Sequence, residues 1–99
     1  MFGNSVIAAL ALVALPAHAQ EDALARSLAA TCASCHGTDG RSVTREVASL
    51  AGQPKDYLVA QMKAFRDGAR PATVMSQIAK GYSDAQIDRL ADYLSRRPR

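Results

Sequence analysis

The sequence predicts a small all-α domain, and three observations support that fold class. The chain has 99 residues, enough for one domain. Three stretches place apolar residues three and four positions apart, which is the spacing of one helix face. No stretch alternates apolar and polar residues with the period of two that a half-buried strand shows. The expected helices span residues 21–33, 54–66 and 83–96, and the expected loops span 37–52 and 69–82.

Residues 1–19 have the pattern of a secretory signal peptide, which leaves 20–99 as the folded domain. The unbroken apolar run VIAALALVAL precedes Pro16 and the small-x-small tripeptide AHA, which ends at Ala19. A membrane-spanning helix needs about 20 apolar residues, so this run is too short for one. We therefore expect cleavage after Ala19, a periplasmic mature chain and no stable membrane span. The segment ahead of the run contains no Lys or Arg, so its retention as a weak anchor is the alternative.

Residues that are typical of helix ends support each of the three expected helices. An acidic pair at residues 21–22 suits the positive N-terminal end of the first helix. Pro54 suits the first turn of the second helix, and Gly68 marks its end. Ser83, with Gln86 three residues later, forms the pattern of a capping box at the start of the third helix.

The composition favours a small domain that needs a stabilising group. Hydrophobic residues make up 48% of the chain, and the formal net charge is +3. Short domains bury little apolar surface and usually rely on a disulfide, a metal or a cofactor. The two cysteines lie so close in sequence that a disulfide between them would close only a tiny loop, which favours a cofactor. The modest charge of a secreted chain gives no support to nucleic-acid binding.

The stretch TCASCHGTDG, residues 31–40, contains both cysteines of the chain. Cys32, Cys35 and His36 form C-x-x-C-H, the signature of covalent haem c attachment. Residues three and four apart share a face of one helical turn, so the two thiols and the imidazole point the same way. The thiols can add to the two vinyl groups of one haem as thioethers, and the imidazole then reaches the iron from the same side. We expect one covalently bound haem c, with His36 as the proximal iron ligand.

Other uses of these three residues have less support. A zinc site needs about four ligands, and the mature chain offers no further cysteine or histidine. A thioredoxin-type redox pair would lie in a βαβ unit, which the sequence pattern lacks. A chance C-x-x-C-H that forms an ordinary disulfide is the remaining alternative.

A methionine is the expected second axial ligand, because the other histidine, His18, belongs to the signal. Met62 falls on the apolar face of the second helix, where flexible thioethers commonly fill a core. Met75 follows Pro71 in the loop before the third helix, and such a loop can wrap over the open face of the haem. We favour Met75 over Met62 as the distal iron ligand, and an ordinary buried loop methionine is the alternative for Met75.

The mature chain resembles the class I c-type cytochromes, in particular the cytochrome subunit of flavocytochrome c sulfide dehydrogenase and related short periplasmic cytochromes c. The resemblance covers CASCHGTDG, SLAGQPKDYLVAQMKAFRDGARPATVM and IAKGYSDAQIDRLADYL. It implies about three helices and long loops around one haem, with the N- and C-terminal helices crossed. It also implies thioethers at Cys32 and Cys35, His36 as proximal ligand and Met75 as distal ligand. Family members often have proline where this chain has Ala48, and the carbonyl at that position accepts a hydrogen bond from the proximal histidine.

These expectations describe a non-catalytic carrier of single electrons. With both axial positions filled the iron has no open site for a substrate, and no general base or nucleophile is evident. We expect a haem subunit that accepts electrons from a catalytic oxidoreductase of the sulfide dehydrogenase type, with a flavoprotein subunit as one candidate partner. A freely diffusing periplasmic electron carrier is the alternative, and a haem-based gas sensor, which requires Met75 to leave the iron easily, is a third hypothesis. A basic rim for an acidic partner, which ordinary solvated helix faces would also explain, comprises Lys63, Arg66, Arg70, Arg96, Arg97 and Arg99.

Overall fold

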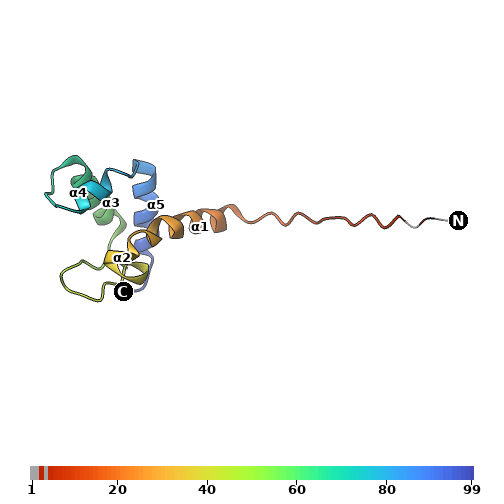
Figure 1. Cartoon of the computed structure of the whole chain (residues 1–99), viewed down its shortest axis with the longest axis horizontal. Helices are drawn as coiled ribbons and strands as arrows, with labels where there is room; N and C mark the ends of the chain where they lie inside the picture. The colour runs from red at the N-terminus through yellow and green to blue at the C-terminus, as the bar shows by residue number, and fades with distance from the viewer. Residues whose placement is uncertain (1–2, 4) are drawn as a thin grey trace.

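The computed structural model describes residue 3 and residues 5–99 of the chain. Residues 5–16 are extended and exposed, and they project away from a helical body (Figure 1). The described residues form helices and no strand, so the expected all-α fold class is confirmed. None of these helices has the length and apolar character needed to cross a membrane. In chain order they are α1 (Ala17–Ala30), α2 (Ala33–His36), the 3₁₀ turn η1 (Thr38–Gly40), α3 (Lys55–Asp67), α4 (Met75–Ala79) and α5 (Asp84–Ser95).

The core lies where α1 crosses α5, and α3 packs against α5 as well (Figure 1). α1 contributes only small side chains to the buried cluster, Ala25 and Ala29, and these let the two helices approach closely. The crossing of the first and last helices, which the resemblance implied, is therefore confirmed. The remaining members of the cluster are Leu58 of α3 with Leu90, Ala91, Tyr93 and Leu94 of α5.

The ends of α3 and α5 lie within one residue of the predicted positions. Gly68 ends α3 in the left-handed conformation, with φ of 84°. The Oγ of Ser83 accepts a hydrogen bond from the N–H of Gln86 at 3.2 Å, and the N–H of Ser83 donates to the Oε1 of Gln86 at 2.9 Å. The capping box is therefore confirmed. Pro54 lies just before α3 rather than inside its first turn.

The predicted first helix is wrong at both ends, because α1 begins at Ala17 and ends at Ala30. The carbonyl of Pro16 accepts the N–H groups of Ala19 at 3.0 Å and Gln20 at 3.3 Å, so the helix starts directly after the proline. Cleavage after Ala19 stays a prediction, and it would remove the first three residues of α1.

The loops expected at 37–52 and 69–82 both contain short helical segments. The first contains η1, a single turn, and the second contains α4. Three and five residues are too few to show an apolar period, so the sequence pattern did not reveal them. Met75 consequently lies at the first position of a helix and not in an irregular loop.

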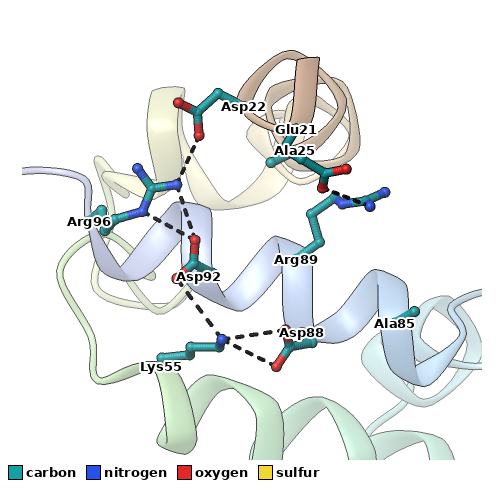
Figure 2. Close-up of a pocket in the computed structure, with 9 residues that line it drawn as sticks. All are labelled: Glu21, Asp22, Ala25, Lys55, Ala85, Asp88, Arg89, Asp92 and Arg96. Atoms are coloured by element: carbon teal, nitrogen blue, oxygen red, sulfur yellow. Dashed lines mark hydrogen bonds and ion pairs between the residues drawn. The ribbon is translucent and has the colours of Figure 1, made fainter. Parts of the chain in front are cut away.

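A charged crevice lies where α1, α3 and α5 meet (Figure 2). Its side chains pair with one another across the helices, and all of these pairs are exposed to solvent, so each contributes about 0–1 kcal/mol. The crevice orients α1 on α5 and contains none of the expected haem-binding residues. The pairs, with N···O distances of 2.8 to 3.3 Å, are Glu21–Arg89, Asp22–Arg96, Asp92–Arg96 and Asp88–Lys55.

Candidate haem site

The C-x-x-C-H motif forms one helical turn between α1 and η1. The carbonyl of Cys32 accepts hydrogen bonds from the N–H groups of Cys35 at 3.3 Å and His36 at 2.9 Å. Both cysteines are free thiols, and no disulfide joins them. This turn has the geometry that places residues three and four apart on one face, as expected from the spacing.

The two thiols differ in their surroundings. Cys32 packs against the edge of the core, whereas Cys35 is exposed. Burial raises the pKa of the Cys32 thiol above its ordinary value, which favours the protonated form. Cys35 is thus the more accessible of the two sulfurs for a reaction with an incoming group.

The imidazole of His36 is held by a backbone carbonyl. Its Nδ1 lies 2.6 Å from the carbonyl oxygen of Ala48. A carbonyl oxygen can only accept a hydrogen bond, so Nδ1 carries the hydrogen and donates it. The other ring nitrogen, Nε2, then keeps its lone pair for a metal. The hydrogen bond that the resemblance implied therefore persists with alanine in place of proline.

Glycines make the turn after His36 possible. Gly37 has φ of 83°, and a Cβ at this position would lie 1.9 Å from the carbonyl oxygen of Arg41. Gly40 has φ of 79°, and its carbonyl accepts the N–H groups of Leu50 at 2.7 Å and Ala51 at 3.1 Å. The turn thereby docks on the segment that follows Ala48, so the HGTDG and SLAGQ stretches of this chain contact each other.

The same turn is attached to α5. The hydroxyl of Tyr93 donates to the carboxylate of Asp39 at 3.2 Å, and Asp39 itself has a positive φ of 53°. The N–H of Gly52 donates to the carbonyl of Leu94 at 3.0 Å. Tyr93 and Leu94, two buried residues of α5, therefore support both sides of the loop that holds the imidazole.

The two candidate methionines have different environments. Met62 of α3 packs against the core cluster, as expected for a packing residue. Met75 is partly buried at the start of α4, and it is not among the side chains of the described residues that pack on that cluster. Val74 and Ile78 beside it are 59% and 41% exposed. The loops after α2 and before α4 extend on the side of the molecule away from the N-terminal tail (Figure 1).

One contact near the site was not predicted from the sequence. Thr31, directly before Cys32, lies with its Oγ1 2.8 Å from the hydroxyl oxygen of Tyr82. The two residues are 51 positions apart, and neither belongs to the set of expected ligands. No periodicity or spacing in one sequence could have paired them.

A C-x-x-C-H turn at the end of a first helix that crosses the last helix defines the class of c-type cytochromes. The family described as "Cytochrome C oxidase, cbb3-type, subunit III" matches residues 19–94. The chain therefore belongs to this family of c-type cytochromes. The family implies one covalently bound haem c and transfer of electrons without catalysis of a further reaction.

Individual relatives support the same class. The chain is 43% identical over 68 residues to cytochrome c-554(548) of Halomonas halodenitrificans, a match that covers 66% of this chain and 82% of that protein. It is 34% identical to cytochrome c-553 of Nitratidesulfovibrio vulgaris, covering 93% of this chain and 91% of the relative. It is 39% identical to the cytochrome subunit of sulfide dehydrogenase of Chlorobaculum tepidum, covering 67% of this chain but only 59% of that subunit.

A solved structure shows the same fold. The cytochrome c4 of Acidithiobacillus ferrooxidans superposes with a TM-score of 0.66 at 35% identity, over 75% of this chain and 50% of that one. The chain thus spans about half of that longer cytochrome.

Proposed function

We propose that the chain is a single-haem periplasmic cytochrome whose haem is bound by Cys32, Cys35, His36 and Met75. The hydrogen bond from His36 Nδ1 to the Ala48 carbonyl carries this proposal, because it leaves Nε2 available for iron. Two free thiols on the same helical turn fit the two thioethers. Met75, outside the packed core and flanked by exposed apolar side chains, fits the distal position better than Met62 does.

In this arrangement the bound haem supplies a one-electron couple between ferric and ferrous iron. The two cysteines would tether the macrocycle and so keep His36 next to the metal. The Ala48 carbonyl fixes the orientation of the imidazole and raises its basicity through the shared hydrogen. Met75 would supply the second protein ligand to the metal and would thereby exclude a substrate from it. A neutral thioether ligand raises the reduction potential relative to a second imidazole.

We infer that the electron donor is an enzyme that oxidises a reduced sulfur compound, with this chain as its haem subunit. Three relatives have names of this kind: the sulfide dehydrogenase subunit of Chlorobaculum tepidum and the thiosulfate dehydrogenase electron acceptors of Thiomonas intermedia and Stutzerimonas stutzeri. A freely diffusing carrier is the second candidate, because two relatives of which the chain covers 82% and 91% are named only as cytochromes c-554(548) and c-553.

Size-exclusion chromatography of a native extract, recorded at haem and flavin wavelengths, tests these proposals. Co-elution of haem and flavin at several times the mass of the mature chain is the expected result for a subunit. A haem peak at the mass of the single chain, without flavin, would instead identify a diffusible carrier and exclude the flavoprotein-subunit proposal. A protein peak without haem absorbance would overturn the proposed site altogether.

A further inference from the structure

A short chain of hydrogen bonds connects Tyr82, Thr31 and the last turn of α1. The Oγ1 of Thr31 lies 2.8 Å from the carbonyl oxygen of Leu28 and 2.8 Å from the hydroxyl oxygen of Tyr82. A threonine hydroxyl has one hydrogen, and the carbonyl can only accept, so this hydrogen goes to Leu28. Thr31 must then accept the hydrogen of Tyr82. The direction of both bonds is therefore fixed by the chemistry of the three groups.

The bond joins the segment with Cys32, Cys35 and His36 to the segment that follows Met75. Thr31 immediately precedes Cys32, on the side of the thioethers and His36. Tyr82 lies in the connection between α4 and α5, three residues after the end of the helix that begins with Met75. The backbone N–H of Tyr82 donates to the carbonyl of Ala79, so the backbone of Tyr82 is bound directly to the last residue of α4.

α4 is held by its packing on α3, with Ala79 fully buried, and by attachments at its two ends. A helix of five residues is too short to be stable alone, because helix nucleation is unfavourable. On its N-terminal side, Arg70 donates hydrogen bonds to Gln61 and to the carbonyl of Ala64 in α3, but Thr73 and Val74 directly before Met75 are exposed. Its C-terminal side is held by Tyr82, which is partly buried against the core and whose carbonyl accepts a hydrogen bond from Arg66 at 3.4 Å. The phenol hydroxyl is the group that connects this end directly to the cysteine turn.

We propose that Tyr82 is a positioning residue that holds α4, and with it the sulfur of Met75, at the iron through its hydrogen bond to Thr31. This inference rests on the proposed ligand pair of His36 and Met75. The thioether is a neutral and weak ligand, so its occupancy depends on how firmly the protein holds it. Loss of one hydrogen bond of this kind raises the population of a detached state by roughly fivefold.

Carbon monoxide provides the test, because it binds ferrous haem only when the distal ligand has left. In the haem-loaded chain, Tyr82→Phe should speed the binding of carbon monoxide roughly fivefold relative to the wild type. Thr31→Val removes the acceptor, together with the bond to the Leu28 carbonyl, and should have an effect at least as large. The double variant should be no faster than Thr31→Val alone, because that change already deletes the bond to Tyr82. Rates equal to the wild type, or effects that add in the double variant, would overturn the proposal.

Two comparison variants separate this inference from general destabilisation and from failure of the proposed site. Tyr93→Phe also deletes one tyrosine hydrogen bond, the one to Asp39 on the His36 side. It should lower the unfolding temperature as much as Tyr82→Phe while changing the rate of carbon monoxide binding far less.

Met75→Ala should give the fastest binding of carbon monoxide of all the variants. If Met75→Ala binds carbon monoxide no faster than the wild type, the ligand assignment fails. If Met75→Ala is fast and Tyr82→Phe is not, only the role of Tyr82 fails.

Discussion

At the scale of single residues, the backbone around His36 determines which side chains the site can use. The acceptor for the imidazole is the carbonyl of Ala48, a group that every residue type possesses. The turn that brings this carbonyl close, in contrast, requires glycine at position 37, where φ is 83° and the carbonyl of Arg41 fills the space of a side chain. Any residue at position 48 therefore still supplies the carbonyl, whereas any side chain at position 37 meets the carbonyl of Arg41.

Gly37→Ala should destabilise the haem-loaded protein by about 3 kcal/mol or more, because it adds both backbone strain and a steric clash. The added Cβ would lie 1.9 Å from a backbone oxygen, so the turn itself has to move. Unfolding by guanidinium chloride, followed by far-ultraviolet circular dichroism, measures the free energy of unfolding for comparison with the wild type.

Gly68→Ala is a matched control for that experiment. Gly68 has nearly the same φ, 84°, but a Cβ there would have no neighbour within 4 Å. Only the backbone strain remains, so we expect a loss of about 1 kcal/mol. Equal losses at the two positions would show that the clash with Arg41 does not occur.

At the scale of helices, the sequence predicted those elements that have local signals. Ser83 and Gln86 lie three residues apart, so the start of α5 could be predicted from their side chains. α4 has no capping side chain and too few residues for a period, so only tertiary packing on α3 reveals it. The ligand turn was predicted for the same local reason as α5, because its residues are adjacent. The contact between Thr31 and Tyr82 joins distant segments and could not be predicted from one sequence.

The ion pair between Arg66 of α3 and Asp84 at the start of α5 should make the free energy of unfolding depend on pH. Arg66 Nη1 lies 2.7 Å from Asp84 Oδ1, and this hydrogen bond lowers the pKa of Asp84 below its ordinary value of about 3.9. As pH falls, the unfolded chain therefore binds a proton at this residue before the folded chain does. The stabilisation that this ion pair gives the folded chain is complete above about pH 4 to 5, and it is lost as pH falls through the lowered pKa of Asp84.

Asp84→Asn should consequently lower the unfolding temperature at pH 6, and the difference from the wild type should shrink as pH falls below about 4. Thermal unfolding of both proteins between pH 6 and pH 3 measures this. Arg66→Gln removes the partner and should reproduce the same change in pH dependence. A difference between wild type and Asp84→Asn that stays constant down to pH 3 would contradict the assignment of the lowered pKa to this pair.

At the scale of the whole molecule, opposite charges are concentrated on one face. Six of the nine acidic residues of the chain form ion pairs, mostly in the crevice between α1, α3 and α5. Arg66 and Arg96, which the sequence suggested for a basic rim, belong to these pairs. The cations that form no ion pair within residues 5–99 are Arg26, Arg41, Arg45, Lys63, Arg70, Lys80, Arg97 and Arg99. Four of these eight, Arg41, Arg45, Arg70 and Lys80, lie in the two loops around the proposed site, where we expect them to favour an acidic redox partner.

We expect the core of the described structure to be too small to stabilise the chain without the bound haem. Half of its ten buried hydrophobic residues are alanines, and Ile87 is the one large side chain that is fully buried among the residues described. Burial of a methyl group stabilises far less than burial of a leucine or phenylalanine side chain. A large apolar cofactor attached to Cys32 and Cys35 would supply the missing buried surface.

The double variant Cys32→Ala/Cys35→Ala, purified without haem, should therefore show no cooperative thermal transition by circular dichroism. Cys35→Ala alone should keep one thioether and unfold cooperatively at a temperature below that of the wild type. The single variant controls for the loss of a thiol, because Cys35 is exposed and its side chain adds little to packing. A haem-free double variant that melts cooperatively near the wild-type temperature would show that the ten buried side chains suffice. In the opposite case, cooperative folding requires the attached haem, which would then be part of the hydrophobic core as well as the redox centre.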